Sequence, residues 1–273
     1  MIRAVKHPNS QGYLERILAA VAGGEISSGA AAERLRAGET RYLDGFAVLD
    51  QGRQTRKGVP EVVYAAGKTP SQVVEICKAV LECGDRVLVS NPTSEHEAAF
   101  RDAFPEVPLR PAGRALVAGY GGAEPSGGRV GAISGGTSDL PALEEAIAVA
   151  REMGVAVKSY PDVGVAGIHR LVEPLRELEA FDPDCLVVAA GMEGALPTVI
   201  SGLVGVPVVG LPTSTGYGLG GDGTAAILGM LQTCSPGLSV VNIDNGVGAG
   251  ATAALIANRA AAGRARRKSP ETD

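Results

Sequence analysis

The carboxyl-terminal half of the chain alternates short apolar runs with longer segments of helical periodicity. Runs such as "RVGAIS", "CLVVAAG" and "PVVGLPT" are apolar throughout, as expected for strands buried on both faces of a sheet. Helical patterns such as "LPALEEAIAVAREMG" and "IHRLVEPLRELEAF" lie between them, and the fourth strand precedes a long helix that reaches Leu231. This alternation predicts a parallel sheet with crossover helices on both faces, a fifth strand at "LSVVNID" and a closing helix over 250–262.

The amino-terminal part predicts a smaller α/β unit. Residues 13–36 have helical spacing broken at Gly23-Gly24, which fits a small helical appendage, and strands and helices alternate again over 61–104. The glycine-rich stretch "AGYGGAEPSGG" then predicts a linker. We therefore expect four regions: a small α/β domain over 1–117, the linker over 118–128, a three-layer flavodoxin- or Rossmann-like α/β domain over 129–262, and a disordered basic tail over 263–273.

Composition narrows the classes of function. The 273 residues carry a net charge of -5, so the basic cluster of the tail fits a solvated end better than a nucleic-acid arm. With 38 glycines, no tryptophan and 4% aromatic residues, a ligand is held mainly by backbone amides, which suits phosphates better than nucleic-acid bases. No apolar stretch fits a membrane span or signal peptide, and we expect a cytoplasmic protein. The spacing of the four cysteines and three histidines predicts neither a zinc site nor a disulfide framework.

Polar and glycine-rich segments follow the strands, where ligands bind in a parallel sheet. After the first strand, "SGGTSDLP" offers free amides and hydroxyls, although Ser138 or Asp139 could act only as a helix cap with Pro141 in the first turn. In the amino-terminal unit, Lys68 follows a glycine after a buried strand and can face an anion, but the full phosphate-loop spacing is absent. The candidate ligand-binding residues are Lys68, Gly136, Ser138, Asp139, Arg170, Gly191, Met192, Thr213, Ser214, Gly216 and Tyr217.

Three side chains are candidates for the chemistry itself. His169 follows the second strand, and Glu193 lies in a tight turn after the third, where it is either an exposed turn residue or a proton acceptor. Cys234, in "QTCSPG", separates a helical run from a strand. Cysteine is often a buried core residue, which is how we interpret Cys77, Cys83 and Cys185, so Cys234 is either a fourth core residue or a nucleophile.

The motifs of residues 129–262 resemble those of the aminoimidazole ribonucleotide carboxylases of purine synthesis. The shared segments are "GGTSD", "HR", "AAG" with a following "LP", "PVVGLPT" and "NIDNGVGAGATAALIA". That family has a histidine where this chain has Ala195, and it has no cysteine at the position of Cys234. With "GMEGALP", "PTSTGYG", "CSPG" and the leading "PEVVYAAGKTP", nearly the whole chain is more similar to the LarB family, the carboxylase/hydrolases of nickel-pincer nucleotide biosynthesis, whose carboxyl-terminal domain is PurE-like.

The resemblance implies an enzyme that converts nicotinic acid adenine dinucleotide and CO2 or bicarbonate into pyridinium biscarboxylic acid mononucleotide and AMP. That product is the precursor of the nickel-pincer cofactor of lactate racemization. Cys234 would add to the pyridinium ring as a thiolate, and Glu193, or His169 as the weaker candidate, would take the ring proton. The resemblance further implies a homo-octamer without a tightly bound cofactor. Charge on the phosphoanhydride would be offset by amides near Ser138 and Asp139, by Arg170, by Lys68 or by Mg²⁺.

Two other functions stay open from the sequence. The chain could be a purine carboxylase or mutase, although Ala195 and the amino-terminal unit argue against this. It could also be a module that binds a dinucleotide without reacting. The choice between nicotinate and nicotinamide dinucleotides rests on the family resemblance alone.

Overall fold

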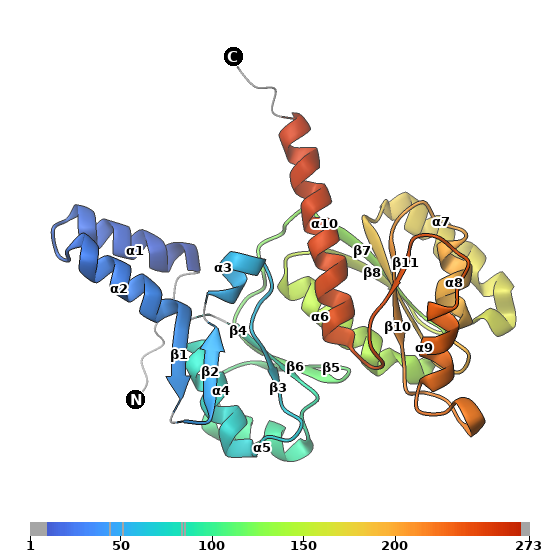
Figure 1. Cartoon of the computed structure of the whole chain (residues 1–273), viewed down its shortest axis with the longest axis horizontal. Helices are drawn as coiled ribbons and strands as arrows, with labels where there is room; N and C mark the ends of the chain where they lie inside the picture. Colours follow the sequence, from blue (N-terminus) through green and yellow to red (C-terminus); the bar gives the residue numbers. More distant parts are fainter. Residues whose placement is uncertain (1–9, 44, 51, 83, 85, 269–273) are drawn as a thin grey trace. The chain divides into compact units, whose positions relative to one another are not determined.

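The computed structural model describes residues 10–43, 45–50, 52–82, 84 and 86–268 (Figure 1). The chain divides into two compact units. The first holds the described residues up to Pro111 together with Ala115–Gly121, and the second holds Ala112–Arg114 and the described residues from Gly122 onward. The division at Gly121 and Gly122 falls within the predicted linker, but the short turn Ala112–Arg114 belongs to the second unit although it precedes the linker in sequence.

The first unit begins with two helices, α1 (Ser10–Ala22) and α2 (Ser28–Glu39). The predicted break between them is present, because Gly24 adopts a left-handed φ of 72° and the Ser27 hydroxyl accepts a hydrogen bond from the Ala30 amide at 3.1 Å. The hairpin of β1 (Thr40–Leu43) and β2 (Ala47–Asp50) and the short helix α3 (Arg53–Lys57) follow, and the sequence pattern did not predict these three elements.

A four-stranded sheet with the order β3-β4-β6-β5 forms the rest of the first unit. Strand β3 pairs parallel with β4, and β4 pairs antiparallel with β6. The capping box of Thr69 and Gln72 begins helix α4, and its N-cap Thr69 directly follows Lys68. The elements are β3 (Val62–Tyr64), α4 (Pro70–Leu81), β4 (Arg86–Ser90), α5 (Ser94–Ala103), β5 (Leu109–Ala112) and β6 (Ala115–Gly119). Strand β6 takes up the first two residues of the predicted linker.

The second unit confirms the predicted α/β fold. Its five strands are all parallel in the order β11-β10-β9-β7-β8, the flavodoxin-like arrangement. Helices α6 and α10 cover one face of the sheet and α7, α8 and α9 cover the other (Figure 1). The strands are β7 (Arg129–Ser134), β8 (Ala156–Tyr160), β9 (Cys185–Ala190), β10 (Val208–Pro212) and β11 (Leu238–Val240). The helices are α6 (Leu140–Glu152), α7 (Val172–Phe181), α8 (Ala195–Ser201), α9 (Thr224–Leu231) and α10 (Gly246–Lys268).

Small residues explain how α10 lies so close to α6. A Cβ added at Gly250 would overlap the Ala146 carbonyl, so only glycine permits this approach of two backbones. Ala253, Ala254 and Ala257 on the same helix are completely buried. The alanine- and glycine-rich composition of the closing helix therefore reflects close helix packing, and it buries apolar surface without large side chains.

Two helices differ in length from expectation. The helix that reaches Leu231 is α9, with only eight residues, and the glycine-rich segment 213–223 before it is a loop with a short 3-10 turn, η3 (Gly218–Gly220). The predicted disordered tail from residue 263 is helical as far as Lys268, and only residues 269–273 of it lie outside the described part. In the described part of the chain, no helix has the length and apolarity needed to cross a bilayer.

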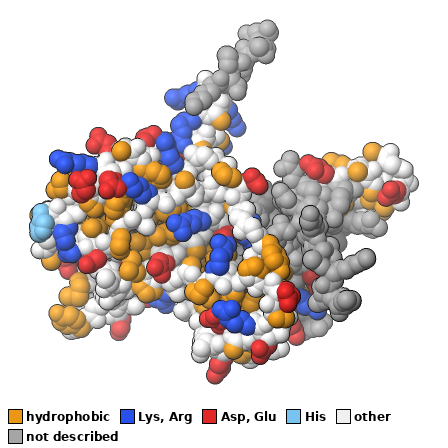
Figure 2. Space-filling model, turned by 180° about the vertical axis from the view of Figure 1, so that it is seen from behind, with side chains coloured by type: hydrophobic (Ala, Val, Ile, Leu, Met, Phe, Trp, Pro, Cys, Tyr) orange, Lys and Arg blue, Asp and Glu red, His pale blue; other side chains and the backbone are white. Residues whose placement is uncertain are grey.

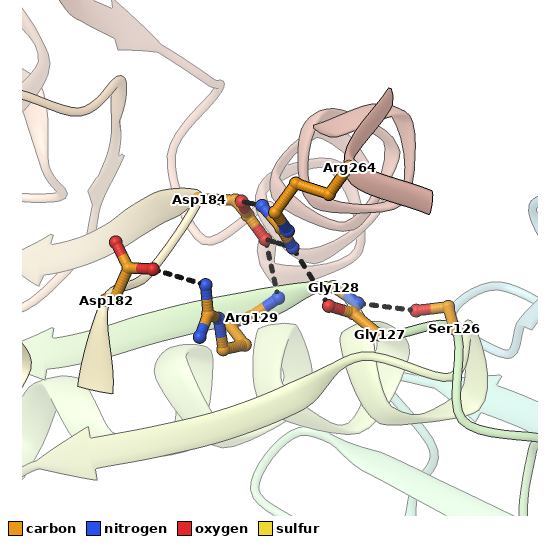
Figure 3. Close-up of polar contacts among 7 residues, drawn as sticks. All are labelled: Ser126, Gly127, Gly128, Arg129, Asp182, Asp184 and Arg264. Carbon is orange, nitrogen blue, oxygen red and sulfur yellow. Dashed lines mark hydrogen bonds and ion pairs between the residues drawn. The ribbon is translucent and has the colours of Figure 1, made fainter. Parts of the chain in front are cut away.

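A polar clamp explains why the charged end of α10 stays helical (Figure 3). The Arg264 guanidinium binds both carboxylate oxygens of Asp184, and it donates to the Gly127 carbonyl at 3.0 Å. Asp184 also accepts the Arg129 amide at 2.9 Å. Burial alone would raise the pKa of Asp184, but the bonds from Arg264 and Arg129 outweigh it and hold that pKa below its usual value. Arg264 thus holds the end of α10 against the segment before β7 and the loop before β9.

Candidate functional site

The loops that carry most predicted site residues meet at one edge of the five-stranded sheet. Because all five strands are parallel, the segments after β7, β8, β9, β10 and β11 emerge at the same, carboxyl edge. Strand β7 lies between β9 and β8, so the chain reverses its direction of winding there. Ligands of such folds bind beside this reversal, where loops diverge and leave backbone groups free.

Asp139 joins two of these loops. Its Oδ2 accepts the Gly136 amide at 2.8 Å, and its Oδ1 accepts the Thr213 hydroxyl at 2.5 Å. Asp139 and Thr213 are 4% and 2% exposed, so this pair is held away from water. Asp139 occupies the N-cap position of α6 but makes no side-chain capping bond to that helix. Capping of α6 alone therefore does not explain this carboxylate, which instead ties the β7 loop to the β10 loop.

Thr215 extends the connection to the loop after β9, and the sequence reasoning did not single it out. Its carbonyl accepts the Met192 amide at 2.8 Å, and its hydroxyl donates to the Ser138 carbonyl at 3.2 Å. Gly191 lies so close to Thr215 that any Cβ there would overlap the Thr215 carbonyl. The three consecutive hydroxyl residues of "PTSTG" were the available signal, because hydroxyls in a loop without apolar side chains need polar partners.

The segment after β8 is held against the β7 loop. The Ser134 hydroxyl accepts the Asp162 amide at 3.1 Å, and the Arg170 guanidinium donates to the Asp162 carbonyl at 2.8 Å. Asp162 and Met192 both adopt left-handed φ angles, of 55° and 51°. Strained non-glycine residues of this kind persist where the surroundings over-determine them, and they cluster at functional sites.

Asp244, in the loop after β11, is a second residue that the sequence reasoning did not single out. Its Oδ1 accepts the Ser214 amide at 3.0 Å, and its Oδ2 lies 2.7 Å from Nη1 of Arg114. Partial burial would raise the pKa of Asp244, but hydrogen bonds with Ser214 and the Arg114 charge outweigh this and lower that pKa. The only sequence signal was the position of Asp244 at the end of the fifth strand.

The remaining predicted side chains at this edge are exposed. These are Ser138, His169, Arg170, Met192, Glu193, Ser214 and Tyr217. Tyr217 is 83% exposed, so the fold does not use its ring for packing in the single chain. Amides, hydroxyls and one guanidinium suit an anionic ligand, and the Glu193 carboxylate can accept a proton. Among the residues that the structure describes, no group of three or more His, Cys, Asp or Glu side chains is arranged to hold a metal ion.

Two predicted residues are not brought to this edge within the second unit. Cys234 follows α9 and precedes β11, so it lies at the amino edge of the sheet, near Ser201 at the end of α8, whose hydroxyl donates to the Pro236 carbonyl at 3.1 Å. Its thiol is exposed. Lys68 belongs to the first unit, where its ammonium donates to the Tyr64 carbonyl at 2.7 Å.

The core interpretation holds for two of the other cysteines. Cys77 and Cys185 are completely buried, and burial raises the pKa of each thiol to about 12. Such thiols are inert at neutral pH, because the thiolate is the reactive form. Cys83 lies outside the described residues.

Comparisons with known proteins match both parts of the chain. Residues 41–119 match the model described as LarB/PurE-like N-terminal domain, and residues 129–269 match the AIR carboxylase model. The chain is 38% identical to the uncharacterized protein MJ0165 of Methanocaldococcus jannaschii over 253 residues, which is 89% of this chain and 96% of that protein. It is 30% identical to the N5-carboxyaminoimidazole ribonucleotide mutase of Thermotoga maritima, over 47% of this chain and 74% of that enzyme. The corresponding mutase of Synechocystis sp. is 34% identical over 46% of this chain and 71% of the enzyme.

Proposed function

Because this chain belongs to the family of LarB-like proteins with a PurE-like AIR carboxylase domain, we propose that it carboxylates the pyridinium ring of nicotinic acid adenine dinucleotide. The family places the chain among carboxylase-related proteins, and the particular substrate is our proposal. In the same site, water cleaves the phosphoanhydride. The products are pyridinium biscarboxylic acid mononucleotide and AMP, and the mononucleotide serves nickel-pincer cofactor biosynthesis.

The exposure of Cys234 is the observation that carries this proposal. A pyridinium ring is electron-poor and does not attack CO2 until a nucleophile has added to it. Of the three cysteines that the structure describes, Cys77 and Cys185 are buried in the cores and only Cys234 is open to solvent. An exposed thiol is suited to attack a cationic ring, because the thiolate is both a strong nucleophile and a good leaving group.

The proposed reaction balances through one covalent adduct. The Cys234 thiolate forms a C–S bond to the ring, and the resulting dihydropyridine carries an enamine carbon. That carbon attacks CO2 and forms the new C–C bond. A base, for which we propose the exposed Glu193 with His169 as the alternative, removes the ring proton. The C–S bond then breaks, the thiolate leaves with its electron pair, and the pyridinium ring is restored.

A second copy of the chain would have to supply the thiol. Cys234 lies at the amino edge of the sheet, whereas Glu193 follows β9 at the carboxyl edge. We propose a homo-oligomer, an octamer as in the related purine enzymes, in which the Cys234 segment of one copy faces the carboxyl edge of another. In the second unit, Leu203 after α8 and Leu228 and Leu231 in α9 are exposed. Figure 2 shows hydrophobic side chains grouped between charged ones on the face that it draws. Large exposed hydrophobic side chains near the thiol suit an interface between copies.

The dinucleotide phosphates would bind to the loop amides around Ser138 and to the exposed Arg170. Both groups lie at the carboxyl edge, where free amides and a guanidinium offset negative charge in the phosphoanhydride. We propose no tightly bound cofactor, and Mg²⁺ or Lys68 are alternatives for this charge. Omitting Mg²⁺ and adding a chelator during turnover separates the metal from the protein groups.

The direct test is turnover by the wild type and by Cys234→Ala. Purified full-length protein is incubated with nicotinic acid adenine dinucleotide and labelled bicarbonate, and mass spectrometry follows the dicarboxylated mononucleotide and AMP. We expect both products from the wild type and neither from Cys234→Ala. Cys185→Ala is the matched control, because it removes a thiol from the core and leaves the exposed thiol in place. Product from Cys234→Ala would refute the thiolate mechanism, and a wild type that binds the dinucleotide without product would favour a binding module.

A mixing experiment tests whether two copies build one site. Cys234→Ala and Asp139→Asn are inactive separately if both residues are needed. If each site takes its cysteine from a neighbouring copy, random mixing of the two variants restores about a quarter of the wild-type activity. No restored activity after verified subunit exchange would show that Cys234 and Asp139 act within one chain.

The purine reaction is a second candidate because the mutases of Thermotoga maritima and Synechocystis sp. match the carboxyl-terminal half. Ala195 opposes it, since the purine carboxylases resembled here have a histidine before the same Leu-Pro pair. Incubation with N5-carboxyaminoimidazole ribonucleotide decides between the two. Turnover of that compound without reaction of the dinucleotide would replace our proposal.

A further inference from the structure

The turn Ala112–Arg114 reaches the carboxyl edge of the five-stranded sheet. It begins at the last residue of β5 and ends directly before β6, but it is part of the second unit. The Arg114 amide donates to the Pro141 carbonyl at 3.0 Å, at the beginning of α6. Gly113 has a left-handed φ of 60°, and a Cβ at that position would overlap the Pro141 carbonyl. The turn is therefore docked directly beside the segment that carries Asp139.

Arg114 connects this turn to the loop after β10 through one carboxylate. Its Nη1 lies 2.7 Å from Oδ2 of Asp244, and the two side chains are 31% and 17% exposed. The other carboxylate oxygen accepts the Ser214 amide at 3.0 Å. Both carboxylate oxygens of Asp244 thus have partners, one in Arg114 of the turn and one in Ser214 of the loop after β10.

The backbone at Asp244 needs such support. Asp244 has a left-handed φ of 57°, and its amide donates to the Pro212 carbonyl at 2.8 Å. A non-glycine residue in this conformation is strained and persists only when its neighbours hold it. Losing the Arg114 charge would release one side of the Asp244 carboxylate, so Ser214 would lose a firmly placed hydrogen-bond acceptor.

We infer that Arg114 is a positioning residue for the substrate loop Thr213–Tyr217 and acts through Asp244. This inference rests on the proposed function where it concerns substrate. Ser214 stands between Thr213, which binds Asp139, and Thr215, which binds Ser138 and Met192. A shift of Ser214 therefore disturbs the loop where it joins the loops after β7 and β9.

The test compares Arg114→Gln, Arg114→Lys and Arg176→Gln in the full chain. Arg176→Gln is the matched control, because Arg176 pairs with Glu173 on α7 at 3.7 Å and both are about 70% exposed. We expect Arg114→Gln to raise KM for the dinucleotide about tenfold, or ~1.4 kcal/mol, with kcat changed by less than about twofold. Arg114→Lys retains the charge and restores part of the loss, and Arg176→Gln behaves as the wild type.

Amide hydrogen exchange in the free protein gives a readout that needs no substrate. Arg114→Gln should speed exchange in peptides covering 213–217 about tenfold, while Arg176→Gln leaves them unchanged. In an Asp244→Asn background, Arg114→Gln should add little, because the ion pair is already lost. Unchanged exchange at 213–217, or full additivity of the two substitutions, would overturn the inference. If the wild type shows no turnover but the exchange results hold, the proposed function fails and the role of Arg114 in placing the loop stands.

Discussion

Replacing Arg264 by alanine tests the clamp between α10 and the amino edge of the sheet. Arg264 binds both oxygens of Asp184 and the Gly127 carbonyl, and the Asp184 side chain is only 6% exposed. Without Arg264 this carboxylate keeps the Arg129 amide as its remaining partner in the clamp. The substitution does not lower helix propensity, because alanine is the best helix former, so any loss of stability reports the lost contacts.

The expected loss in the free energy of unfolding follows from how far the Arg264 side chain is exposed. Removing one partner of a fully buried ion pair destabilises by ~3–5 kcal/mol. The Arg264 side chain is 40% exposed, and water screens part of the interaction, so we expect a loss of ~2 kcal/mol in the free energy of unfolding. For a protein of this size that corresponds to about 4–8 °C in Tm.

Denaturant and thermal unfolding of the full chain measure the loss. Arg267→Ala is the matched control, because Arg267 is exposed on the same last turns of α10 and its removal should change stability by less than about 0.5 kcal/mol. Equal unfolding free energies for Arg264→Ala and Arg267→Ala would refute the reasoning. They would show that the clamp adds nothing to the stability of the helix end.

Acid should reduce this difference between wild type and Arg264→Ala. The pKa of Asp184 is lower in the folded state, so the clamp is fully present above the unfolded pKa of about 3.9 and is lost as the pH falls through the folded value. The difference in unfolding free energy should therefore be constant near neutral pH and shrink below about pH 4. A difference that grows on acidification would contradict the assigned charge state.

Two further predictions concern the site and the thiols. Thr213→Val removes the hydroxyl that donates a hydrogen bond to the buried Asp139 carboxylate. We therefore expect a loss of ~1.5–3 kcal/mol in the free energy of unfolding, measured by denaturation, and weaker dinucleotide binding, measured by calorimetry. An unchanged free energy of unfolding would show that this hydrogen bond does not stabilise the fold. A thiol reagent followed by peptide mass spectrometry should label Cys234 in the folded protein and reach Cys77 and Cys185 only after unfolding, and equal labelling rates would contradict the burial of those two.

Much of the second unit could be predicted from local patterns. Continuous apolar runs followed by helical periodicity specify parallel strands and crossovers, because each element must bury its own apolar face. The segment "RVGAIS" coincides with β7, and the loops with Gly136, Gly191 and Thr213 lie at one edge, as parallel topology requires. The paired strands β1-β2 and β5-β6 were missed. Strands β1, β2 and β5 have only four residues each, and the buried strand β6 ends inside the glycine-rich stretch, so none of them carries a strong periodic signal.

The chain by itself determined the fold class and the family, since these depend on periodicity and on short motifs, and it predicted candidate site residues within single loops. Tertiary structure decided which residues meet. Arg114 and Asp244 lie far apart in sequence, and their pairing at the edge of the sheet leaves no local pattern. Likewise, the charged end of α10 is held by the contact of Arg264 with Asp184, which lies 80 residues earlier in the sequence. Cys234 falls at the opposite edge from Glu193, because a helix returns the chain across the sheet before each new strand.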